Sequence, residues 1–183
     1  MLSGHEALNN ATGVIIAEGY STAATLRDAF NKMDMPNVVA VAAVDAGNLR
    51  PVAQAVHAKF PDMPIVIAGD NDLHLLQDSR IQKNRGWDAA QDAAKAVDGK
   101  AIRPVFGTDK PDKTQTDFND LARKSGLDTV QRQLYSAKKY IETAREAKKV
   151  IEITKDRQKT TNRVQERGRP APPKKDKEQN MSR

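Results

Sequence analysis

The sequence contains no cysteine among its 183 residues and only three histidines. The absence of cysteine excludes a disulfide framework and any thiolate zinc site. His5, His57 and His74 are far apart, and none stands in a metal-ligand spacing such as HExxH. Aromatic residues make up only 4% of the chain. We therefore expect phosphate contacts to outweigh base stacking in a complex with nucleic acid.

Long apolar runs are also missing. No stretch has the length and apolar character of a membrane span, and the first residues do not form a charged-then-apolar signal peptide. The sequence therefore predicts a soluble, cytoplasmic protein without a membrane partner.

Charge is distributed unevenly along the chain. Residues 1–130 hold 14 Lys and Arg against 17 Asp and Glu, a net of −3, whereas residues 131–183 hold 16 against 7, a net of +9. These values sum to the overall +6. A concentrated basic segment favours polyanions, with nucleic acid ahead of a membrane surface. A segment that only increases solubility is the alternative.

Short apolar runs alternate with helical patterns after a polar lead-in over residues 1–12. The strands are continuously apolar, as expected for a parallel sheet whose two faces are both covered. The fold class is therefore α/β, with a Rossmann-like parallel sheet of about four strands and helices on both faces. Ser21 and Asn48 are the expected N-caps of the first two helices. The predicted strands cover 13–18, 37–44, 64–69 and 101–106, and the predicted helices cover 21–33, 48–60, 86–97 and 117–126.

The character of the chain changes after residue 126. Apolar residues fall on one narrow helical stripe surrounded by Lys and Arg: Val130, Leu134, Ala137, Ile141, Ala144 and Ile151. The pattern predicts a long, basic, amphipathic helix within residues 129–165, which either pairs with a partner helix or packs on the domain. Residues 166–183 are rich in Pro and Lys and are expected to be disordered.

The stretch PIVIAGDNDLHLL combines a buried strand with two closely spaced carboxylates. The apolar run of residues 65–68 ends in Gly69, and Asp70 and Asp72 follow. Ligands of open parallel sheets bind at the carboxyl ends of the strands. The acidic residues at those ends are Glu18, Asp45, Asp70, Asp72, Asp117 and Asp120.

A hard divalent cation relieves the repulsion between such carboxylates, and Mg²⁺ prefers oxygen ligands. The sequence therefore predicts a Mg²⁺ site at this edge of the sheet. Plainer roles exist for three residues: Asp70 as an N-cap, Asp45 as a turn former and Asp120 as a solvated helix residue.

Five motifs carry a resemblance to a known family. EGYSTAATL, VDAGNL, IAGDND, NRGWDAA and TDFNDL stand in the order found in Toprim domains, over roughly residues 13–130. The combination of EGYSTA with GDND is specific for Toprim. DAGNL and DFNDL resemble the plasmid and phage DNA primases, including those associated with conjugation. Residues 13–128 are therefore expected to form a Toprim-like catalytic and metal-binding domain.

The resemblance implies roles for individual residues. Glu18 matches the Toprim glutamate, a general acid or base that can share in metal binding, and Asp70 and Asp72 match the Mg²⁺ ligands. Asp117 would lie near the same rim and is expected to be a further metal ligand. The implied chemistry is nucleotidyl or phosphoryl transfer on DNA, with Mg²⁺, or Mn²⁺ in its place, positioning phosphate oxygens.

The predicted partners are DNA, preferably single-stranded, nucleotides, and a relaxase or primase partner. The residues expected to contact nucleic acid are Lys83, Arg85, Lys138, Lys139, Arg145, Lys148 and Lys149. The helix start at Arg85 and Gly86 could hold a phosphate, or could be a plain helix start. Trp87 either stacks on a base or packs against the sheet. Deleting residues 131–183 is expected to weaken DNA binding and its salt dependence.

The sequence departs from a complete primase. Primases of this type need a catalytic region ahead of the Toprim domain and often a zinc-binding domain, yet only 12 residues precede the first predicted strand. The expectation is a fragment of a larger protein, a freestanding Toprim protein or the terminal domain of a conjugation protein. Three functions stay open: a DNA primase of a mobile element, a non-catalytic DNA-binding accessory module, and a small Mg²⁺-dependent nuclease.

Overall fold

The protein is described here by a computed structural model that covers residues 5–77, 83–107 and 114–167. The chain divides into two units, Met1–Glu146 and Ala147–Arg183. The elements are α1 His5–Asn9, β1 Gly13–Ala17, α2 Tyr20–Lys32, β2 Val38–Ala42, the 3₁₀ helix η1 Ala46–Asn48, α3 Leu49–Lys59, β3 Ile65–Ala68, the 3₁₀ helix η2 Leu73–Gln77, α4 Arg85–Lys95, β4 Lys100–Ile102, α5 Phe118–Ser125, α6 Leu127–Gln133 and α7 Tyr135–Arg167.

The four strands form one parallel sheet in the order β2-β1-β3-β4. β1 and β3 are the central strands, and every residue of both is buried. This confirms the predicted α/β class and the parallel sheet of about four strands.

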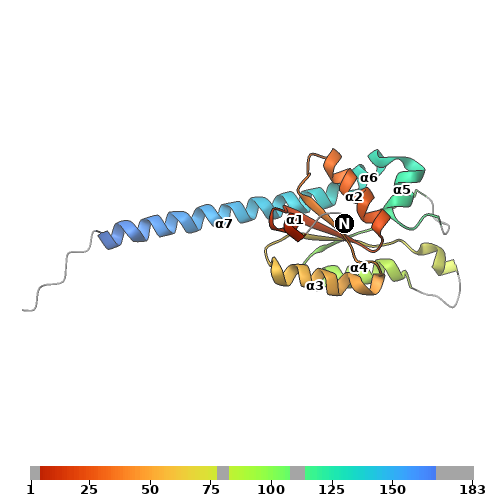
Figure 1. The fold of residues 1–183 in the computed structure, drawn as a ribbon, viewed down its shortest axis with the longest axis horizontal. Coiled ribbons are helices and arrows are strands. Elements are labelled where there is room, and N and C mark those ends of the chain that lie inside the picture. The colour runs from red at the N-terminus through yellow and green to blue at the C-terminus, as the bar shows by residue number, and fades with distance from the viewer. Residues whose placement is uncertain (1–4, 78–82, 108–113, 168–183) are drawn as a thin grey trace, which may run out of the picture. The chain divides into compact units, whose positions relative to one another are not determined.

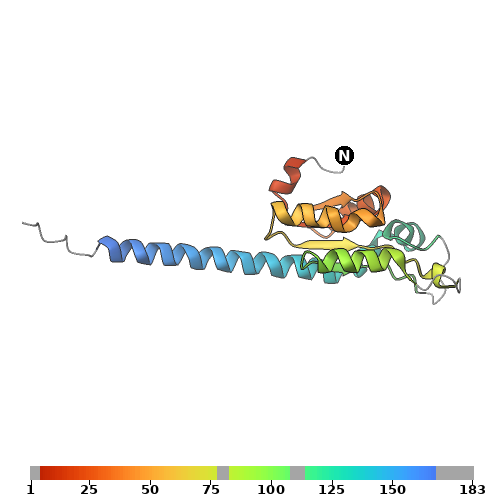
Figure 2. The same cartoon turned by 90° about the horizontal axis from the view of Figure 1, so that it is seen from below.

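Two helical layers cover the sheet. α2, α5 and α6 lie on one face, and α3 and α4 lie on the other (Figures 1 and 2). Successive side chains of β1 point to opposite faces of the sheet. Ile15 therefore packs with the first layer and Ile16 with the second. Continuous apolar runs are thus the signature of strands that are buried on both faces.

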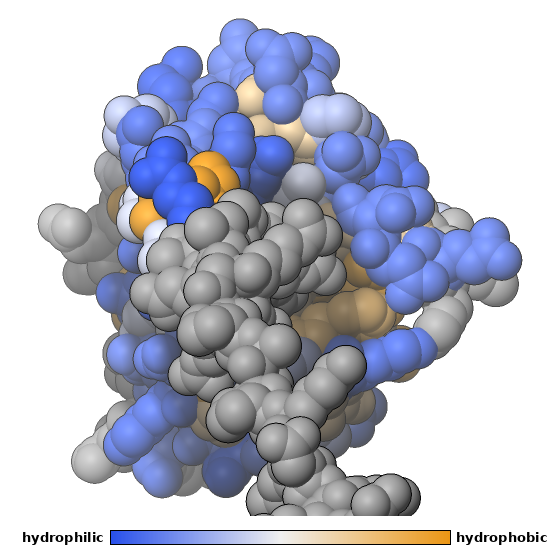
Figure 3. Space-filling model, turned by 90° about the vertical axis from the view of Figure 1, so that its left-hand side faces the viewer, coloured by the Kyte–Doolittle hydropathy of each residue, from blue (hydrophilic) through white to orange (hydrophobic). Residues whose placement is uncertain are grey.

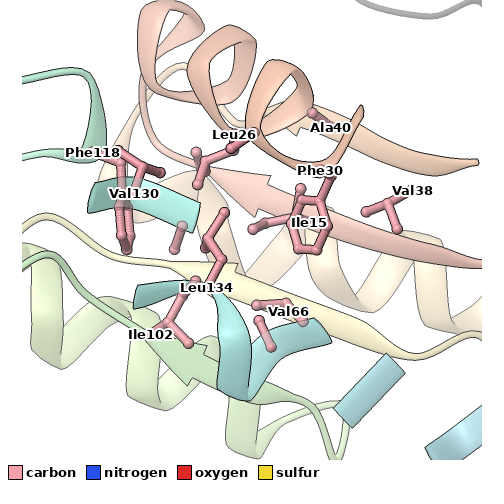
Figure 4. Close-up of a cluster of buried hydrophobic side chains, with 14 of the residues drawn as sticks. Ile15, Leu26, Phe30, Val38, Ala40, Val66, Ile102, Phe118, Val130 and Leu134 are labelled. Atoms are coloured by element: carbon pink, nitrogen blue, oxygen red, sulfur yellow. The ribbon is translucent and has the colours of Figure 1, made fainter. Parts of the chain in front are cut away.

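The core beneath α2 is built from segments that are distant in sequence. Leu26 and Phe30 of α2 meet Ile15, Val66 and side chains from α5 and α6 (Figure 4). α7 contributes two fully buried side chains to this cluster, Ala137 and Ile141. The beginning of α7 is therefore part of the domain core.

The predicted long helix from residue 129 is instead two helices, α6 and α7, which meet at Leu134. The apolar stripe also divides. Val130, Leu134 and Ile141 are fully buried, whereas Ile151 is 53% exposed. Within Met1–Glu146 the stripe packs on the domain, so the packed-strut alternative is correct for this part.

Two local predictions are wrong. Gly19 takes the N-cap position of α2, so Ser21 is already inside the helix. The fourth strand ends at Ile102 instead of continuing to residue 106, because Pro104 has no N–H for a sheet ladder. Beyond it, Val105 pairs with the Gln133 side chain, donating its N–H to Oε1 (2.9 Å) and accepting from Nε2 (2.7 Å).

The second unit contains the part of α7 that follows Glu146. The part of α7 after Glu146 exposes Val150, Ile151 and Ile153 beside basic residues. In the view of Figure 3 the coloured residues at the surface are mostly hydrophilic, with small hydrophobic areas between them. The prediction of a disordered tail falls largely on residues 168–183, outside the described part of the chain.

A search of the described residues for a helix with the length and apolar character of a membrane span found none.

Candidate metal centre

The carboxylates follow the strands on either side of the point where the strand order reverses. The chain passes from β1 outward to β2 and then returns to β3 on the other side of β1. Ala17 and Ala68 are register partners at the ends of β1 and β3. Glu18 and Asp70 therefore leave the sheet beside each other, at the position where open α/β sheets bind their ligands.

Asp70 is a carboxylate in a poor environment for a negative charge. Burial, and then the charges of Glu18, Asp117, Asp72 and more weakly Asp120, raise the pKa of Asp70 to about 8. Its Oδ1 is buried and has no hydrogen-bond partner among the described residues. A buried carboxylate oxygen without a partner needs a proton or a cation.

The environment of Glu18 also disfavours a negative charge. Burial raises the pKa of Glu18, and the charges of Asp72 and Asp45 add to the effect. A hydrogen bond from the backbone N–H of Ala46 partly offsets it. The charge of Asp72 thus acts on Glu18, and the charges of Glu18 and Asp72 both act on Asp70, so the three carboxylates lie in one electrostatic environment.

Asp72 is held by the start of α4. Its Oδ2 accepts a hydrogen bond of 2.9 Å from the backbone N–H of Gly86. Its own N–H donates to Oδ1 of Asn84 at 2.9 Å. The positive end of the α4 dipole thus faces Asp72, which stabilises the negative charge there.

This contact changes the interpretation of the helix start. The N–H of Gly86 donates to Asp72, and the N–H of Trp87 donates to the Asn84 side chain (3.3 Å). Two of the first N–H groups of α4 are therefore used within the protein. The structure favours a helix start fixed against the loop over a ready phosphate site at Arg85 and Gly86.

Two glycines allow α4 to approach the loop this closely. A Cβ atom built on Gly69 would lie 2.5 Å from Cβ of Ala90 and 2.8 Å from the carbonyl oxygen of Gly86. A Cβ atom on Gly86 would lie 2.8 Å from Cβ of Asp70 and 2.9 Å from its carbonyl oxygen. The G of GDND and the G of NRGW are therefore steric partners.

Asp117 lies in the same environment but has structural partners. Its Oδ2 accepts a 2.6 Å hydrogen bond from the Thr22 hydroxyl, and its Oδ1 accepts a 2.7 Å bond from the N–H of Asp120. Asp117 is thus the N-cap of α5 and joins α5 to α2.

Two of the plainer roles can also be judged. Asp45 caps η1 by accepting from the N–H of Gly47 at 2.7 Å, so its turn-forming role is confirmed. Asp120 accepts from both the N–H and the hydroxyl of Thr116, each at 3.2 Å. It is half-buried rather than a plain solvated helix residue.

The residues predicted to contact nucleic acid differ in their exposure and in their bonds to the rest of the protein. Lys83 and Arg85 are exposed beside the start of α4, and Arg145 is exposed within the first unit. Lys138 is half-buried, donates to the carbonyl oxygen of Met33 at 3.1 Å and pairs with Glu142 at 3.7 Å. Its role is therefore largely to hold α7 on the domain.

The remaining basic residues of α7 are more open. Lys139 is exposed and pairs with Glu142 at 3.4 Å. Lys148 and Lys149 are exposed in the second unit. Trp87 is half-buried, packs with the core under α3 and α4, and is covered by the Arg103 guanidinium at 4.9 Å from its ring centroid. Packing is therefore the correct interpretation of Trp87.

Sequence reasoning missed the polar side chains that support the acidic loop. Asn71 and Asn84 are 4% and 7% exposed and hydrogen-bond to each other, and Thr22 is 1% exposed. Asn84 stands directly before a helical pattern, which was an available N-cap signal. The links from Asn71 to distant loops had no local signal.

Within the described residues, no group of three or more His, Asp or Glu side chains is arranged closely enough to hold a metal ion. The arrangement instead provides a charged, partly buried acidic rim with one unsatisfied carboxylate oxygen. Mg²⁺ commonly takes only one or two protein carboxylates, with water and substrate phosphates as its other ligands. The residues present therefore fit a Mg²⁺ ion that is bound together with a phosphate substrate.

Comparison with known proteins agrees with this description. Residues 13–128 match the Toprim domain family. The chain is 48% identical over 106 residues to a DNA primase TraC of Escherichia coli, and 47% identical over 105 residues to a second protein of that name and organism. These alignments cover 58% and 57% of this chain but only 9% and 7% of the relatives, so the chain spans under a tenth of their length. No solved structure gave a significant match. The chain therefore belongs to the Toprim domain family, as its EGYSTA and GDND motifs predicted.

Proposed function

We propose that this Toprim domain is the Mg²⁺-dependent nucleotidyl- or phosphoryl-transfer module of a plasmid or mobile-element DNA primase associated with conjugation. The observation that carries the proposal is Asp70. Its buried Oδ1 has no hydrogen-bond partner among the described residues, and its pKa is raised to about 8. A carboxylate kept in this state is one that a bound cation would satisfy.

The proposed ligands are Asp70 and Asp72, with Glu18 close by. When bound, Mg²⁺ would position phosphate oxygens and offset the charge that develops during transfer. Asp72 is already oriented by Gly86. Glu18, whose pKa is raised, is suited to hold or release a proton at the reacting hydroxyl. Asp117 would keep α5 beside the site rather than bind the metal directly.

The proposed substrate is DNA, in single-stranded form, together with nucleotides. Lys83 and Arg85 are exposed near the acidic loop and could contact phosphates there. The basic part of α7 with Lys148 and Lys149 would add non-specific affinity. Because TraC relatives are far longer, we propose that activity requires a further protein region or a relaxase or primase partner.

The first test is a metal titration followed by NMR. Mg²⁺, and then Mn²⁺, is added to the purified protein while the amide signals of Asp70 and Asp72 are observed. We expect saturable shifts confined to the acidic loop and lost in Asp70→Asn. Asp128→Asn, which removes an exposed carboxylate from the first turn of α6, should leave them unchanged. Shifts that persist in Asp70→Asn would contradict the proposed ligands.

The second test separates the functions by product. Single-stranded DNA, nucleotides and Mg²⁺ are supplied with the protein and its proposed partner. A primase makes dinucleotides or longer primers, a nuclease shortens the DNA, and an accessory module binds DNA without either product. Synthesis that disappears in Asp70→Asn and Asp72→Asn supports the primase, while intact binding without turnover in all variants supports the accessory module.

A further inference from the structure

We infer that Asn84 is a positioning residue that holds Asp72 for metal binding. The inference rests on the proposed function. It concerns a side chain that belongs to neither the acidic group nor the basic surface. Asn84 lies directly before α4, is 7% exposed and connects the helix start with the acidic loop.

The side chain of Asn84 uses both of its polar atoms. Its Oδ1 accepts from the N–H of Asp72 at 2.9 Å and from the N–H of Trp87 at 3.3 Å. Its Nδ2 donates to Oδ1 of Asn71 at 2.8 Å. Two of the three bonds therefore go to the acidic loop rather than to the helix.

Asn71 extends this connection to the next loops. Its Nδ2 donates to the carbonyl oxygen of Pro104 at 2.9 Å, and its backbone N–H donates to that of Thr116 at 2.7 Å. The segment between Asp70 and Asp72 is thus tied at its centre to the loops that follow β4. Because Asn71 is 4% exposed, these bonds are shielded from water.

The start of α4 adds a direct contact to the carboxylate. Gly86 holds one oxygen of Asp72 through its backbone N–H. Asn84 holds the backbone of the same aspartate. The backbone and the side chain of Asp72 are therefore fixed by residues two positions apart, which prevents the carboxylate from turning away from the site. Partners that orient metal ligands typically affect metal affinity by 10–100-fold.

The Asn84 side chain makes more hydrogen bonds than an N-cap requires. Capping requires only the bond to Trp87, and Ser caps a helix about as well as Asn. Ser is shorter and has no amide donor, so it cannot also reach both Asp72 and Asn71. Asn84→Ser therefore keeps the helix cap and removes the connection to the loop.

The test compares three variants with the unaltered protein in two measurements. The first is Mg²⁺ affinity from the NMR titration, and the second is hydrogen exchange of the Asp72 amide without metal. We expect Asn84→Ser to weaken Mg²⁺ binding about 10-fold or more and to speed exchange at Asp72. Asn84→Asp keeps an acceptor oxygen for the N–H of Asp72 but loses the donor to Asn71 and adds a charge beside the acidic loop, so only its exchange is compared, and this should stay slow at Asp72.

The third variant controls for general destabilisation. Val130→Ala leaves a small cavity in the core cluster that contains α2, on the other face of the sheet from α4. We expect it to lower the melting temperature without altering Mg²⁺ affinity or exchange at Asp72. Should Asn84→Ser fold poorly, Asn84→Asp tests the same bond: slow exchange at Asp72 supports the inference, and fast exchange in spite of the retained acceptor oxygen overturns it.

The outcomes distinguish this inference from the proposed function. Equal Mg²⁺ affinity in Asn84→Ser and the unaltered protein overturns the inference and leaves the metal site intact. Faster exchange at Asp72 in Asn84→Ser, with no Mg²⁺ binding by the unaltered protein even when a nucleotide is present, overturns the proposed function but supports the positioning of the loop. Unchanged exchange at Asp72 in Asn84→Ser contradicts the positioning itself.

Discussion

The hydroxyl of Thr22 donates a 2.6 Å hydrogen bond to Oδ2 of Asp117, a residue 95 positions away in the chain. The bond joins the first turn of α2, which follows Glu18, to the N-terminus of α5. It is short, as expected when the acceptor is charged. It fixes two of the elements that surround the acidic rim.

Removing this hydroxyl should be costly. Thr22→Val keeps the shape of the side chain but leaves an oxygen of Asp117 without its donor, so we expect a loss of about 1–3 kcal/mol in the free energy of unfolding. Urea denaturation measures the loss. Thr25→Val is the matched control, because its 3.2 Å bond goes to the neutral Asn119 side chain and should be worth less, about 0.5–1.5 kcal/mol. Equal losses would contradict a charge-assisted bond at Thr22.

The raised pKa of Asp70 predicts how stability depends on pH. Its pKa rises from 3.8 to about 8 on folding, so the folded state binds the proton more tightly than the unfolded state. This contribution to stability is therefore complete below about pH 4 and is lost as the pH rises toward 8. Asp70→Asn lacks this dependence and should be more stable than the unaltered protein by roughly 1–3 kcal/mol at pH 8 without metal.

Thermal unfolding across pH 4 to 9 measures this effect, first in EDTA and then in Mg²⁺. With Mg²⁺ the difference should shrink or reverse, because a ligand that binds only the folded unaltered protein stabilises it by mass action. Parallel stability curves for the two proteins from pH 4 to pH 8 would contradict a raised pKa at Asp70.

The contact between Gly86 and Asp70 predicts a steric effect. Gly86→Ala would place a Cβ atom 2.8 Å from Cβ of Asp70 and 2.9 Å from its carbonyl oxygen, so α4 and the acidic loop must move apart. We expect a loss of about 2–4 kcal/mol in stability and a clear loss of Mg²⁺ affinity. Gly19→Ala is the control, since its Cβ would meet nothing closer than the Thr22 hydroxyl at 3.8 Å. A well-folded Gly86→Ala with unchanged Mg²⁺ affinity would refute this account.

The boundary between the two units, after Glu146, predicts which truncation leaves a folded domain. Deleting residues 131–183, as the charge distribution suggested, would remove the buried side chains of Leu134, Ala137 and Ile141 and should unfold the domain. Deleting 147–183 removes the basic unit and leaves this core complete. The shorter truncation should keep the melting temperature, weaken DNA binding and flatten the dependence of log K on log salt.

Fluorescence anisotropy with a single-stranded oligonucleotide at several salt concentrations measures this slope. The double variant Lys148→Glu and Lys149→Glu should act in the same direction and keep the full length of the chain. An unchanged slope in both proteins would show that the basic unit is not the DNA contact.

The sequence predicted most of the sheet because its strands are marked by a simple physical signal. Residues 65–68 are apolar without alternation, as required for burial on two faces. Parallel strands place their carboxyl ends at one edge, which was enough to bring Glu18 and Asp70 together. The end of β4 was missed because its boundary depends on Pro104 and on pairing with Gln133, a residue 28 positions beyond Val105.

Local sequence patterns could not predict the polar side chains that hold the acidic loop in place. Asn71 and Asn84 lie 13 residues apart and are joined by a buried bond that depends on how α4 returns to the sheet. The division at Leu134 carried no Gly or Pro to mark it. Charge alone placed the basic segment at residue 131, whereas the core continues through Ile141. The same stretch of helix buries Ala137 and Ile141 and exposes Lys139.

The first residue of β1, Gly13, lies against α7. A Cβ atom there would meet the Ile141 side chain at 2.9 Å. The strand that leads to Glu18 therefore begins beneath a helix that lies beyond the family match, which ends at residue 128. As a module that could be joined to other proteins by recombination or by design, this domain must carry its sequence to about Glu146. A fusion made at residue 128 would preserve every motif and lose part of the core.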